Sequence, residues 1–339
     1  GSEMCIRDSY TATPVQRWMD QGALVLGKVN LDEFTFGSSN ESSAFKPHPR
    51  NPWDTAKVAG GSSGGSASAV AAYEGAISLG TDTSGSIRLP ASYCGTVGLK
   101  PTYGRVSRYG LIAFGSSLDC PGPLSRDSRD AALALQSMAG ADPNDSTCAA
   151  VAVPNYLQEM EKGVKGLRIG LSPDYFKLTM MDSATGKVIE HDLPKRIKDE
   201  VLRAAQLLAN AGAEIVEGVN MPHTRYGIPA YFVISRVEAA SNLHRFDGVK
   251  YGHRAASGFN GLNEMYRKSR GEGFGQQPKL RILMGMYVSA AQYSEQYYAR
   301  ALKIRTLIRG DFDKAFGKID MLLTPSTPSP AFDIGGIFG

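Results

Sequence analysis

Two glycine- and serine-rich blocks constrain the fold of this chain more than any other feature. The first spans residues 60–66 (GGSSGGS) and the second spans residues 80–86 (GTDTSGS). Glycine allows positive φ and close backbone approach, so several consecutive N–H groups in such a block can converge on one point. That arrangement suits an anion or an oxyanion, and a serine among those amides is a candidate nucleophile. Two such blocks around one short helix–strand unit predict a single site built from both.

The first block, taken alone, allows three interpretations. A phosphate-binding loop is excluded, because the GxxxxGK[ST] pattern needs a Lys-Ser/Thr pair that is absent. Residues 61–65 match the GxSxG pattern of a nucleophile elbow, but residues 51–59 have turn character around Pro52 and do not predict the buried strand that an elbow requires. The third interpretation is a flexible linker without chemistry. The second block favours a site over a linker.

A nucleophilic serine needs a base, and no histidine of this sequence sits in a motif. The five histidines are His48, His191, His223, His244 and His253. A lone histidine is more often a surface or structural residue than a catalytic one. A Ser-His-Asp triad therefore has no support in the sequence.

Hydrophobic periodicity predicts an α/β protein around the blocks. Helices are expected at about 13–21, 66–76, 127–139, 195–211 and 293–316, and strands at 23–26, 76–80, 167–171, 213–216 and 319–323. Strand, helix and strand over 167–216 predict a crossover unit on a parallel or mixed sheet. Residues 37–68 should form loop or turn up to the start of a helix, and residues 250–277 predict a polar surface excursion.

Composition excludes several classes of protein. Apolar residues make up 42% and charged residues 21%, which is typical of a globular chain and not of a disordered or fibrous one. The net charge of +4 over 339 residues is too small to indicate a nucleic-acid surface, and no apolar run approaches a membrane span. The four cysteines form no CxxC pair, which fits a reduced cytosolic chain and argues against zinc.

Three segments together resemble the amidase signature family. They are residues 60–67 (GGSSGGSA), 80–88 (GTDTSGSIR) and 94–102 (CGTVGLKPT), in matching order and spacing. Within that family the chain looks most like the glutamine-hydrolysing subunits of tRNA-dependent amidotransferases, through segments such as 27–34 (GKVNLDEF) and 103–111 (YGRVSRYGL). The resemblance covers nearly everything from Thr13 onward. It implies an α/β fold with a mixed central β-sheet flanked by helices on both faces.

The catalytic group of that family is a Ser–cis-Ser–Lys triad. By position, the resemblance makes Ser86 the nucleophile and Ser62 the bridging serine, held on a cis peptide bond. It assigns the peptide amides of Thr83, Ser84 and Gly85, with that of Ser86, to the oxyanion hole. A neutral lysine would take a proton through Ser62 from Ser86, which attacks the side-chain amide of glutamine and forms an acyl-enzyme intermediate. This hypothesis predicts that Ser86 lies within hydrogen-bond reach of Ser62.

The resemblance also implies a substrate pocket. Arg281 falls where the family places an arginine for the α-carboxylate of glutamine, a task that suits a guanidinium group. Without the resemblance, a surface salt bridge would be the expected role of Arg281. Tyr231 falls where a tyrosine lines the pocket. Phe36 falls where a methionine is common, and Gly37 beside it is expected to contact substrate.

The chain departs from the family pattern in three respects. The family's lysine lies further upstream than the residues before Ser62 reach, and Lys28 belongs to a downstream segment, so the chain as given is expected to be inactive. Residues 1–9 show no period and are expected to be a non-native leader, with 10–339 forming a single amidase-signature domain truncated at both ends. Ser84 stands where a glycine is usual, which is expected to tighten the oxyanion turn.

The resemblance finally implies partners. The ammonia would pass to a partner subunit, which would convert Glu-tRNA(Gln) to Gln-tRNA(Gln). The expected partners are glutamine, the B and C subunits of the amidotransferase and, through the complex, tRNA. The glutamine-hydrolysing chain would need no cofactor or metal, whereas ATP and Mg²⁺ would be used by the partner subunit, in the bacterial cytoplasm or an organelle matrix. Two alternatives stay open: a free-standing amidase with another amide substrate, and a non-catalytic fragment.

Overall fold

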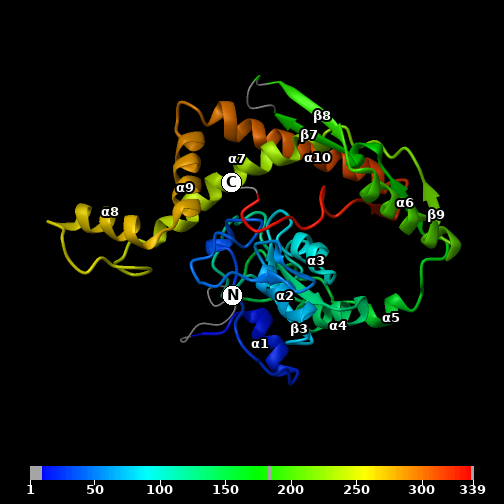
Figure 1. Ribbon diagram of the computed structural model, residues 1–339, viewed down its shortest axis with the longest axis horizontal. Coiled ribbons are helices and arrows are strands. Elements are labelled where there is room, and N and C mark those ends of the chain that lie inside the picture. Colours follow the sequence, from blue (N-terminus) through cyan, green and yellow to red (C-terminus); the bar gives the residue numbers. More distant parts are fainter. Residues whose placement is uncertain (1–9, 182–184, 186, 337–339) are drawn as a thin grey trace. The chain divides into compact units, whose positions relative to one another are not determined.

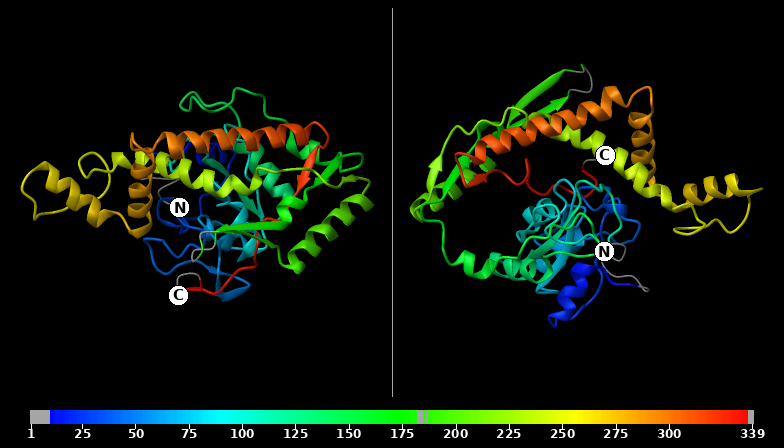
Figure 2. Two further views of the ribbon diagram at one scale, coloured as in Figure 1. Left: turned by 90° about the horizontal axis from the view of Figure 1, so that it is seen from above. Right: turned by 180° about the vertical axis from the view of Figure 1, so that it is seen from behind.

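The computed structural model describes residues 10–181, 185 and 187–336, which form two compact units. Unit 1 contains Gly1–Leu157, Ser235–Tyr293 and Ala331–Gly339, and unit 2 contains Gln158–Ile234 and Ser294–Pro330. Both units combine helices and strands, as the sequence predicts (Figures 1 and 2). The expected leader, residues 1–9, lies outside the described residues, and the expectation of one domain over 10–339 stays a prediction.

The helices and strands follow one another along the whole described chain. The α-helices are α1 (Thr13–Asp20), α2 (Gly64–Ala71), α3 (Arg88–Cys94), α4 (Ser128–Met138), α5 (Tyr156–Met160), α6 (Lys195–Asn210), α7 (Gly227–Asn242), α8 (Leu262–Gly273), α9 (Gln276–Ser289) and α10 (Arg300–Phe316). The strands are β1 (Arg50–Asn51), β2 (Asp54–Val58), β3 (Ile77–Asp82), β4 (Val97–Gly98), β5 (Cys120–Ser125), β6 (Arg168–Leu171), β7 (Lys177–Met181), β8 (Val188–Asp192), β9 (Glu214–Val216) and β10 (Met321–Leu323).

Unit 1 is built on an antiparallel sheet of order β3-β5-β4, with helices on both faces. Side chains alternate along a strand, so Ile77 and Leu79 of β3 share one face, and Ser78 shares the other face with its partner Leu124 of β5. Ile77 and Leu79 pack against a core cluster that includes residues of α1 and α4, whereas Leu124 belongs to a cluster with residues of α2 and α3. The sheet therefore carries α1 and α4 on one face and α2 and α3 on the other.

Unit 2 is built on a parallel sheet of order β10-β6-β9. The chain passes from β6 through α6 to β9, and these two strands pair in parallel, which confirms the predicted crossover unit. Its core contains Met221, Ala315 and Ile319, which are 6% exposed or less. The α/β prediction therefore holds in both units, with an antiparallel sheet in one and a parallel sheet in the other.

The predicted strand at 23–26 is wrong. These residues have no regular secondary structure, and Leu24 and Leu26 are 86% and 77% exposed. A strand needs a hydrogen-bonding neighbour, and none of the described strands pairs with this segment. A groove of about 700 Å³ is instead lined both by residues 23–29 and by residues 75–79, at the β3 edge of the sheet.

The expected loop at 37–68 and the expected polar surface excursion at 250–277 both contain regular structure. The region 37–68 holds the β1–β2 hairpin, in which Arg50 pairs with Val58 around a turn at Pro52 and Trp53. A short, mostly exposed strand therefore does precede the first glycine–serine block, although the sequence suggested only a turn. The region 250–277 holds α8, whose apolar contacts are few: its buried residues are Met265 and Ser269. That scarcity of buried apolar positions is why its periodicity gave no helical signal.

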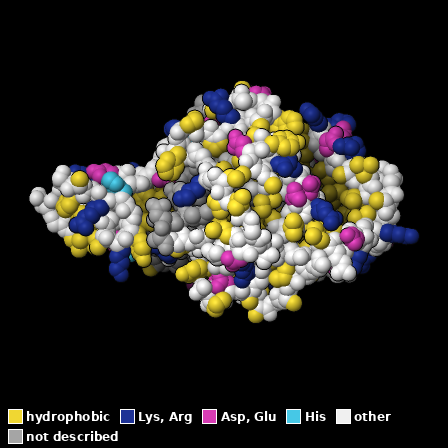
Figure 3. Space-filling view, turned by 90° about the horizontal axis from the view of Figure 1, so that it is seen from below, with side chains coloured by type: hydrophobic (Ala, Val, Ile, Leu, Met, Phe, Trp, Pro, Cys, Tyr) yellow, Lys and Arg dark blue, Asp and Glu magenta, His cyan; other side chains and the backbone are white. Residues whose placement is uncertain are grey.

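The described surface carries mixed charge. On the face drawn in Figure 3, basic and acidic side chains are interspersed among apolar ones and do not gather into one basic patch. Among the residues that the structure describes, no helix has both the length and the apolar character needed to cross a membrane.

Candidate active site

The first glycine–serine block joins β2 to α2 through a cis peptide bond. This bond links Gly61 to Ser62, where the resemblance implies a cis peptide. Ser62 has no solvent exposure, and its hydroxyl group has no hydrogen-bond partner among the described residues. A buried hydroxyl without a partner is uncommon in folded proteins and is a reason to look for chemistry at that atom.

The second block forms the turn between β3 and α3 and lies against the first. The Ser63 N–H donates to the Ser86 carbonyl (3.1 Å), and the Ser63 hydroxyl bonds to both the N–H and the carbonyl of Thr81 (3.2 Å each). The two blocks are therefore in direct contact, and the prediction that they form a single site stays a prediction. Ser86 is 9% exposed. No hydrogen bond joins Ser86 to Ser62, so the prediction that the two lie within hydrogen-bond reach is not confirmed, and the Ser86 hydroxyl makes no hydrogen bond to other described residues.

Backbone amides of the second block are only partly available to an oxyanion. The N–H groups of Thr83, Ser84 and Ser86 make no hydrogen bond within the described chain. The Gly85 N–H, by contrast, donates to the Asp82 carboxylate at 2.6 Å. Of the predicted oxyanion donors, Gly85 is therefore engaged elsewhere in this structure, because a carboxylate at the end of β3 draws its N–H away.

Asp82 is the internal anchor of this turn. Its buried carboxylate accepts from the Ile87 N–H (3.2 Å) and from both Nε and Nη2 of Arg88 (2.9 Å each), besides Gly85. Burial by itself would raise the pKa of the Asp82 carboxyl, but the Arg88 guanidinium and the backbone donors lower the pKa below its usual value. Asp82 is thus a charged, fully bonded group that fixes the Ser86 side of the turn.

A second buried carboxylate, Asp32, supports the first block. Its two oxygens accept from the Asn40 N–H (3.1 Å), the Ser42 N–H (3.1 Å) and the Ser42 hydroxyl (2.6 Å). The Asp32 N–H in turn donates to the Ser62 carbonyl at 3.2 Å. Burial raises the pKa of the Asp32 carboxyl above its ordinary value, although these donors oppose the rise. Asp32 therefore supports the cis-bonded Ser62 through the hydrogen bond from its N–H to the Ser62 carbonyl.

Gly61 is required by this packing, and we expect Gly61→Ala to destabilise the chain. A Cβ at Gly61 would lie 2.2 Å from Asp32 Oδ2 and 2.9 Å from the Asn40 backbone nitrogen. Overpacking of this kind costs about 1–3 kcal/mol. Urea unfolding would measure the loss, with Gly75→Ala as the matched control, because a Cβ there meets nothing closer than 3.6 Å. Equal midpoints for the two variants would contradict this account.

The structure brings three of the four predicted pocket residues together. The Arg281 guanidinium lies over the Phe36 ring, with Cζ 5.1 Å from the ring centroid, and Gly37 packs directly against the Asp32 carboxylate. Phe36 is fully buried and meets the Phe114 ring edge-on at 4.6 Å. Arg281 therefore contributes a half-buried cation stacked on an aromatic face, which differs from an exposed salt bridge.

Tyr231, the fourth pocket residue, lies on the part of α7 that belongs to unit 2. It is half-buried, and its ring meets Phe232 edge-on at 5.8 Å. Its role stays a prediction. No hydrogen bond joins a histidine to Ser86 or Ser62 in the described part of the chain; His223, for example, bonds to Asp311 in unit 2.

Sequence reasoning missed the three buried carboxylates around the site: Asp32, Asp82 and Asp119. Asp82 stands inside the second block directly before the turn, a position from which a side chain can cap nearby N–H groups, so the block itself offered a signal. Asp32 lies inside the segment 27–34 that supported the resemblance. Asp119 lies far from both blocks in sequence, and only the folded chain reveals its contact with Thr83.

Comparison with known proteins shows the family of this chain. The family model described as Amidase matches residues 4–337. The chain is 53% identical over 326 residues to the A subunit of glutamyl-tRNA(Gln) amidotransferase from Koribacter versatilis, covering 96% of this chain and 65% of that protein. It is 51% identical to the protein of the same name from Carboxydothermus hydrogenoformans, covering 96% and 64%. The chain therefore spans slightly less than two thirds of the length of these relatives.

Solved structures give the same family. The A subunit of glutamyl-tRNA(Gln) amidotransferase from Thermotoga maritima superposes with a TM-score of 0.77 at 39% identity, covering 97% of this chain and 64% of that one. A peptide amidase from Stenotrophomonas maltophilia superposes with a TM-score of 0.73 at 30% identity, covering 96% and 65%. These neighbours confirm the predicted amidase-signature fold. The chain belongs to the amidase family.

Proposed function

We propose that this chain is the catalytic part of a glutamine-hydrolysing subunit of a glutamyl-tRNA(Gln) amidotransferase. The observation that supports the proposal is the contact between the two blocks: Ser63, which directly follows the cis Gly61–Ser62 bond, donates its N–H to the Ser86 carbonyl at 3.1 Å. Relatives that are 53% and 51% identical to this chain over the 326 aligned residues bear that name, which supports the choice of substrate.

The proposed reaction proceeds through an acyl-enzyme. Ser86 Oγ attacks the side-chain amide carbon of glutamine while its proton passes through the Ser62 hydroxyl to a base. The carbonyl oxygen becomes an oxyanion facing the amides of Thr83, Ser84 and Ser86. Collapse breaks the C–N bond, and the proton goes to the departing nitrogen, which leaves as ammonia. Water then hydrolyses the Ser86 ester, releasing glutamate and restoring the hydroxyl.

Arg281 is the proposed anchor for the α-carboxylate of glutamine. Its guanidinium is held against the fully buried Phe36 ring, so it loses little side-chain freedom when it binds a carboxylate. Gly37 is proposed to line the same pocket, and Tyr231 remains a predicted substrate-binding residue.

The base is proposed to be a lysine, as in the family's triad. None of the described lysines hydrogen-bonds to Ser62, whose hydroxyl has no partner among the residues that the structure describes. We therefore expect residues 1–339 by themselves to be inactive, because removing one member of such a triad costs several powers of ten in rate.

The proposed partners follow from the proposed reaction. Ammonia would be delivered to the B subunit of a complex that also contains a C subunit, where ATP and Mg²⁺ activate tRNA-bound glutamate. The complex would work in the bacterial cytoplasm or an organelle matrix.

Ammonia release tests this function. The full-length protein with its partner subunits should release ammonia from glutamine and form Gln-tRNA(Gln) when Glu-tRNA(Gln) and ATP are present. Hydrolysis of an aryl or fatty-acid amide without activity on glutamine would favour a free-standing amidase instead. Ammonia release from glutamine by residues 1–339 alone would contradict the expected need for a lysine.

A further inference from the structure

Asp119 is a buried carboxylate that the proposed reaction does not use. It is 8% exposed, and three donors converge on it. Its Oδ1 accepts from the Thr83 hydroxyl (2.6 Å) and the Gly115 N–H (3.1 Å), and its Oδ2 accepts from the Phe114 N–H (2.8 Å) and again from the Gly115 N–H (3.0 Å). In all of these hydrogen bonds the Asp119 oxygens are the acceptors, which suits an ionised carboxylate because that group can only accept.

The Thr83 contact reaches the turn that carries the unengaged amides. Asp82 secures the far side of this turn through Gly85 and Ile87. At the start of the turn, Ser84 is exposed and makes no hydrogen bond within the described chain. Of Thr83 and Ser84, only Thr83 therefore holds its part of the turn through a side-chain hydrogen bond between described residues. Two carboxylates thus hold the turn: Asp82 through the N–H groups of Gly85 and Ile87, and Asp119 through the Thr83 hydroxyl.

Asp119 can hold Thr83 firmly because its own loop is anchored. The Asn242 side chain donates to the Phe114 carbonyl (3.0 Å), and Glu238 accepts from both the N–H (3.0 Å) and the hydroxyl (2.5 Å) of Ser117. Both anchoring residues lie on the part of α7 within unit 1. The support therefore runs from a helix, through the loop, to the Asp119 carboxylate.

We propose that Asp119 is a positioning residue for the oxyanion-binding turn: it fixes Thr83 through the side-chain hydroxyl and so aims the free N–H groups at the reacting carbonyl. This inference rests on the proposed function of Ser86. Oxyanion donors contribute only when they are already aimed at the place where charge develops, so a small misplacement lowers the rate substantially. Asp119 acts through Thr83 and touches no substrate.

The test compares four variants of the full-length protein with its partner subunits. Asp119→Asn keeps the shape but presents an NH₂ group to N–H donors, and Thr83→Val removes the hydroxyl. Each should lower kcat for glutamine about 10- to 100-fold with little change in KM. The double variant should be no slower than the slower single one, because both break the same contact. Thr83→Ser, which keeps the hydroxyl, should retain at least about ten times the kcat of Thr83→Val.

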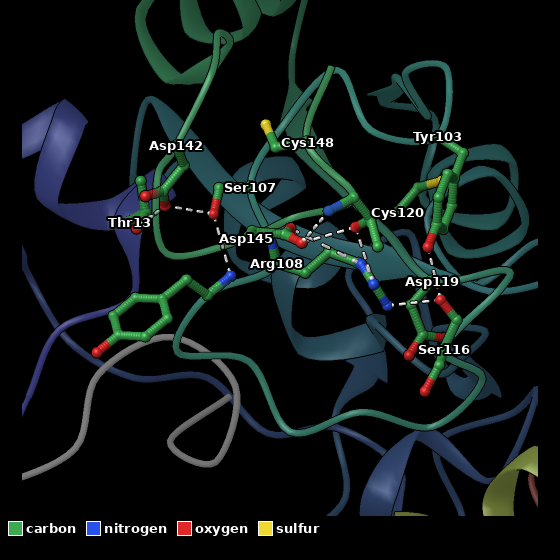
Figure 4. A network of polar contacts seen from close by, with 12 residues as sticks. Thr13, Tyr103, Ser107, Arg108, Ser116, Asp119, Cys120, Asp142, Asp145 and Cys148 are labelled. Carbon is green, nitrogen blue, oxygen red and sulfur yellow. Dashed lines mark hydrogen bonds and ion pairs between the residues drawn. The ribbon is translucent and has the colours of Figure 1, made fainter. Parts of the chain in front are cut away.

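Asp142 supplies the matched control. It is also 8% exposed and accepts from two hydroxyls, those of Thr13 and Ser107, at 2.6 Å each (Figure 4). Asp142→Asn should lower the melting temperature and leave kcat unchanged. If Asp119→Asn behaves in the same way, or if its effect multiplies with that of Thr83→Val, the inference is overturned.

A second readout separates this inference from the proposed function. A fluorophosphonate phosphonylates an activated serine and places its phosphoryl oxygen in the oxyanion site. Labelling of Ser86 should be about 10- to 100-fold slower in Asp119→Asn and Thr83→Val than in the natural protein. Normal labelling of both variants would overturn the positioning role alone, whereas no labelling of Ser86 in the natural protein would overturn the proposed function and this inference together.

Discussion

Ser86→Ala should reduce ammonia release from glutamine by at least about 10⁴-fold in the full-length protein with its partner subunits, because removal of a catalytic serine leaves only binding and oxyanion stabilisation. Ser86 carries one of the three unengaged amides of its block, and its hydroxyl makes no hydrogen bond to other described residues. Its removal breaks no hydrogen bond between described residues, so the melting temperature should stay within about 1–2 °C. The measurement is kcat for glutamine together with a thermal unfolding curve.

Ser68→Ala is the control for this variant. Ser68 lies on α2, and its hydroxyl donates to the Arg50 carbonyl at 2.7 Å, away from the unengaged amides. This change should leave kcat unaltered and cost about 1 kcal/mol of stability at most. Appreciable glutamine hydrolysis by Ser86→Ala would assign the nucleophile to another group and would remove the basis of the proposed reaction.

The part of the site that the sequence could predict is the part made of local backbone geometry. Each glycine–serine block is contiguous, so the candidate serines and amides can be identified from the sequence alone. The cis peptide bond before Ser62 was confirmed where the resemblance implied it. The crossover unit β6–α6–β9 was predictable for a similar reason. Its strands and helix have strong periodicity and are close in sequence.

The supporting carboxylates could not be predicted in this way, because their partners are distant in sequence. Asp119 meets Thr83 across 36 positions, and nothing in the residues around either one signals the contact. The same limit explains the error at 23–26, where an apolar run suggested a buried strand. Burial and pairing depend on neighbours from elsewhere in the chain, and among the described strands that segment has none.

The sequence also could not predict which backbone N–H groups of the second block are free to bind an oxyanion. From the sequence, the N–H groups of four consecutive residues appeared equivalent as donors. In the structure, the Gly85 N–H donates to the Asp82 carboxylate, whereas those of Thr83, Ser84 and Ser86 make no hydrogen bond to described residues. A side-chain acceptor two or three residues away competes for a backbone N–H group. The outcome of that competition depends on the direction of the Asp82 side chain, which Arg88 fixes.

Ser62→Ala should separate activity from stability. Ser62 has no solvent exposure and its hydroxyl has no partner in the described part of the chain, so the folded chain carries the cost of a dehydrated polar group there. Replacing it by a methyl group should raise the free energy of unfolding of residues 1–339 by about 1 kcal/mol. In the full-length protein the same change should lower kcat for glutamine by about 10²–10⁴-fold, because the proton of Ser86 loses its relay.

Ser63→Ala is the matched control, and its expected sign is the opposite. The neighbouring Ser63 is equally inaccessible, at 5% exposure, but its hydroxyl both donates to the Thr81 carbonyl and accepts from the Thr81 N–H. Removing it leaves two buried backbone groups without a partner and should cost about 1–3 kcal/mol. Urea unfolding of the two variants side by side decides the question. If Ser62→Ala is destabilised as much as Ser63→Ala, the Ser62 hydroxyl has a structural partner. The absence of a hydrogen bond at Ser62 would then no longer support its role as a proton relay.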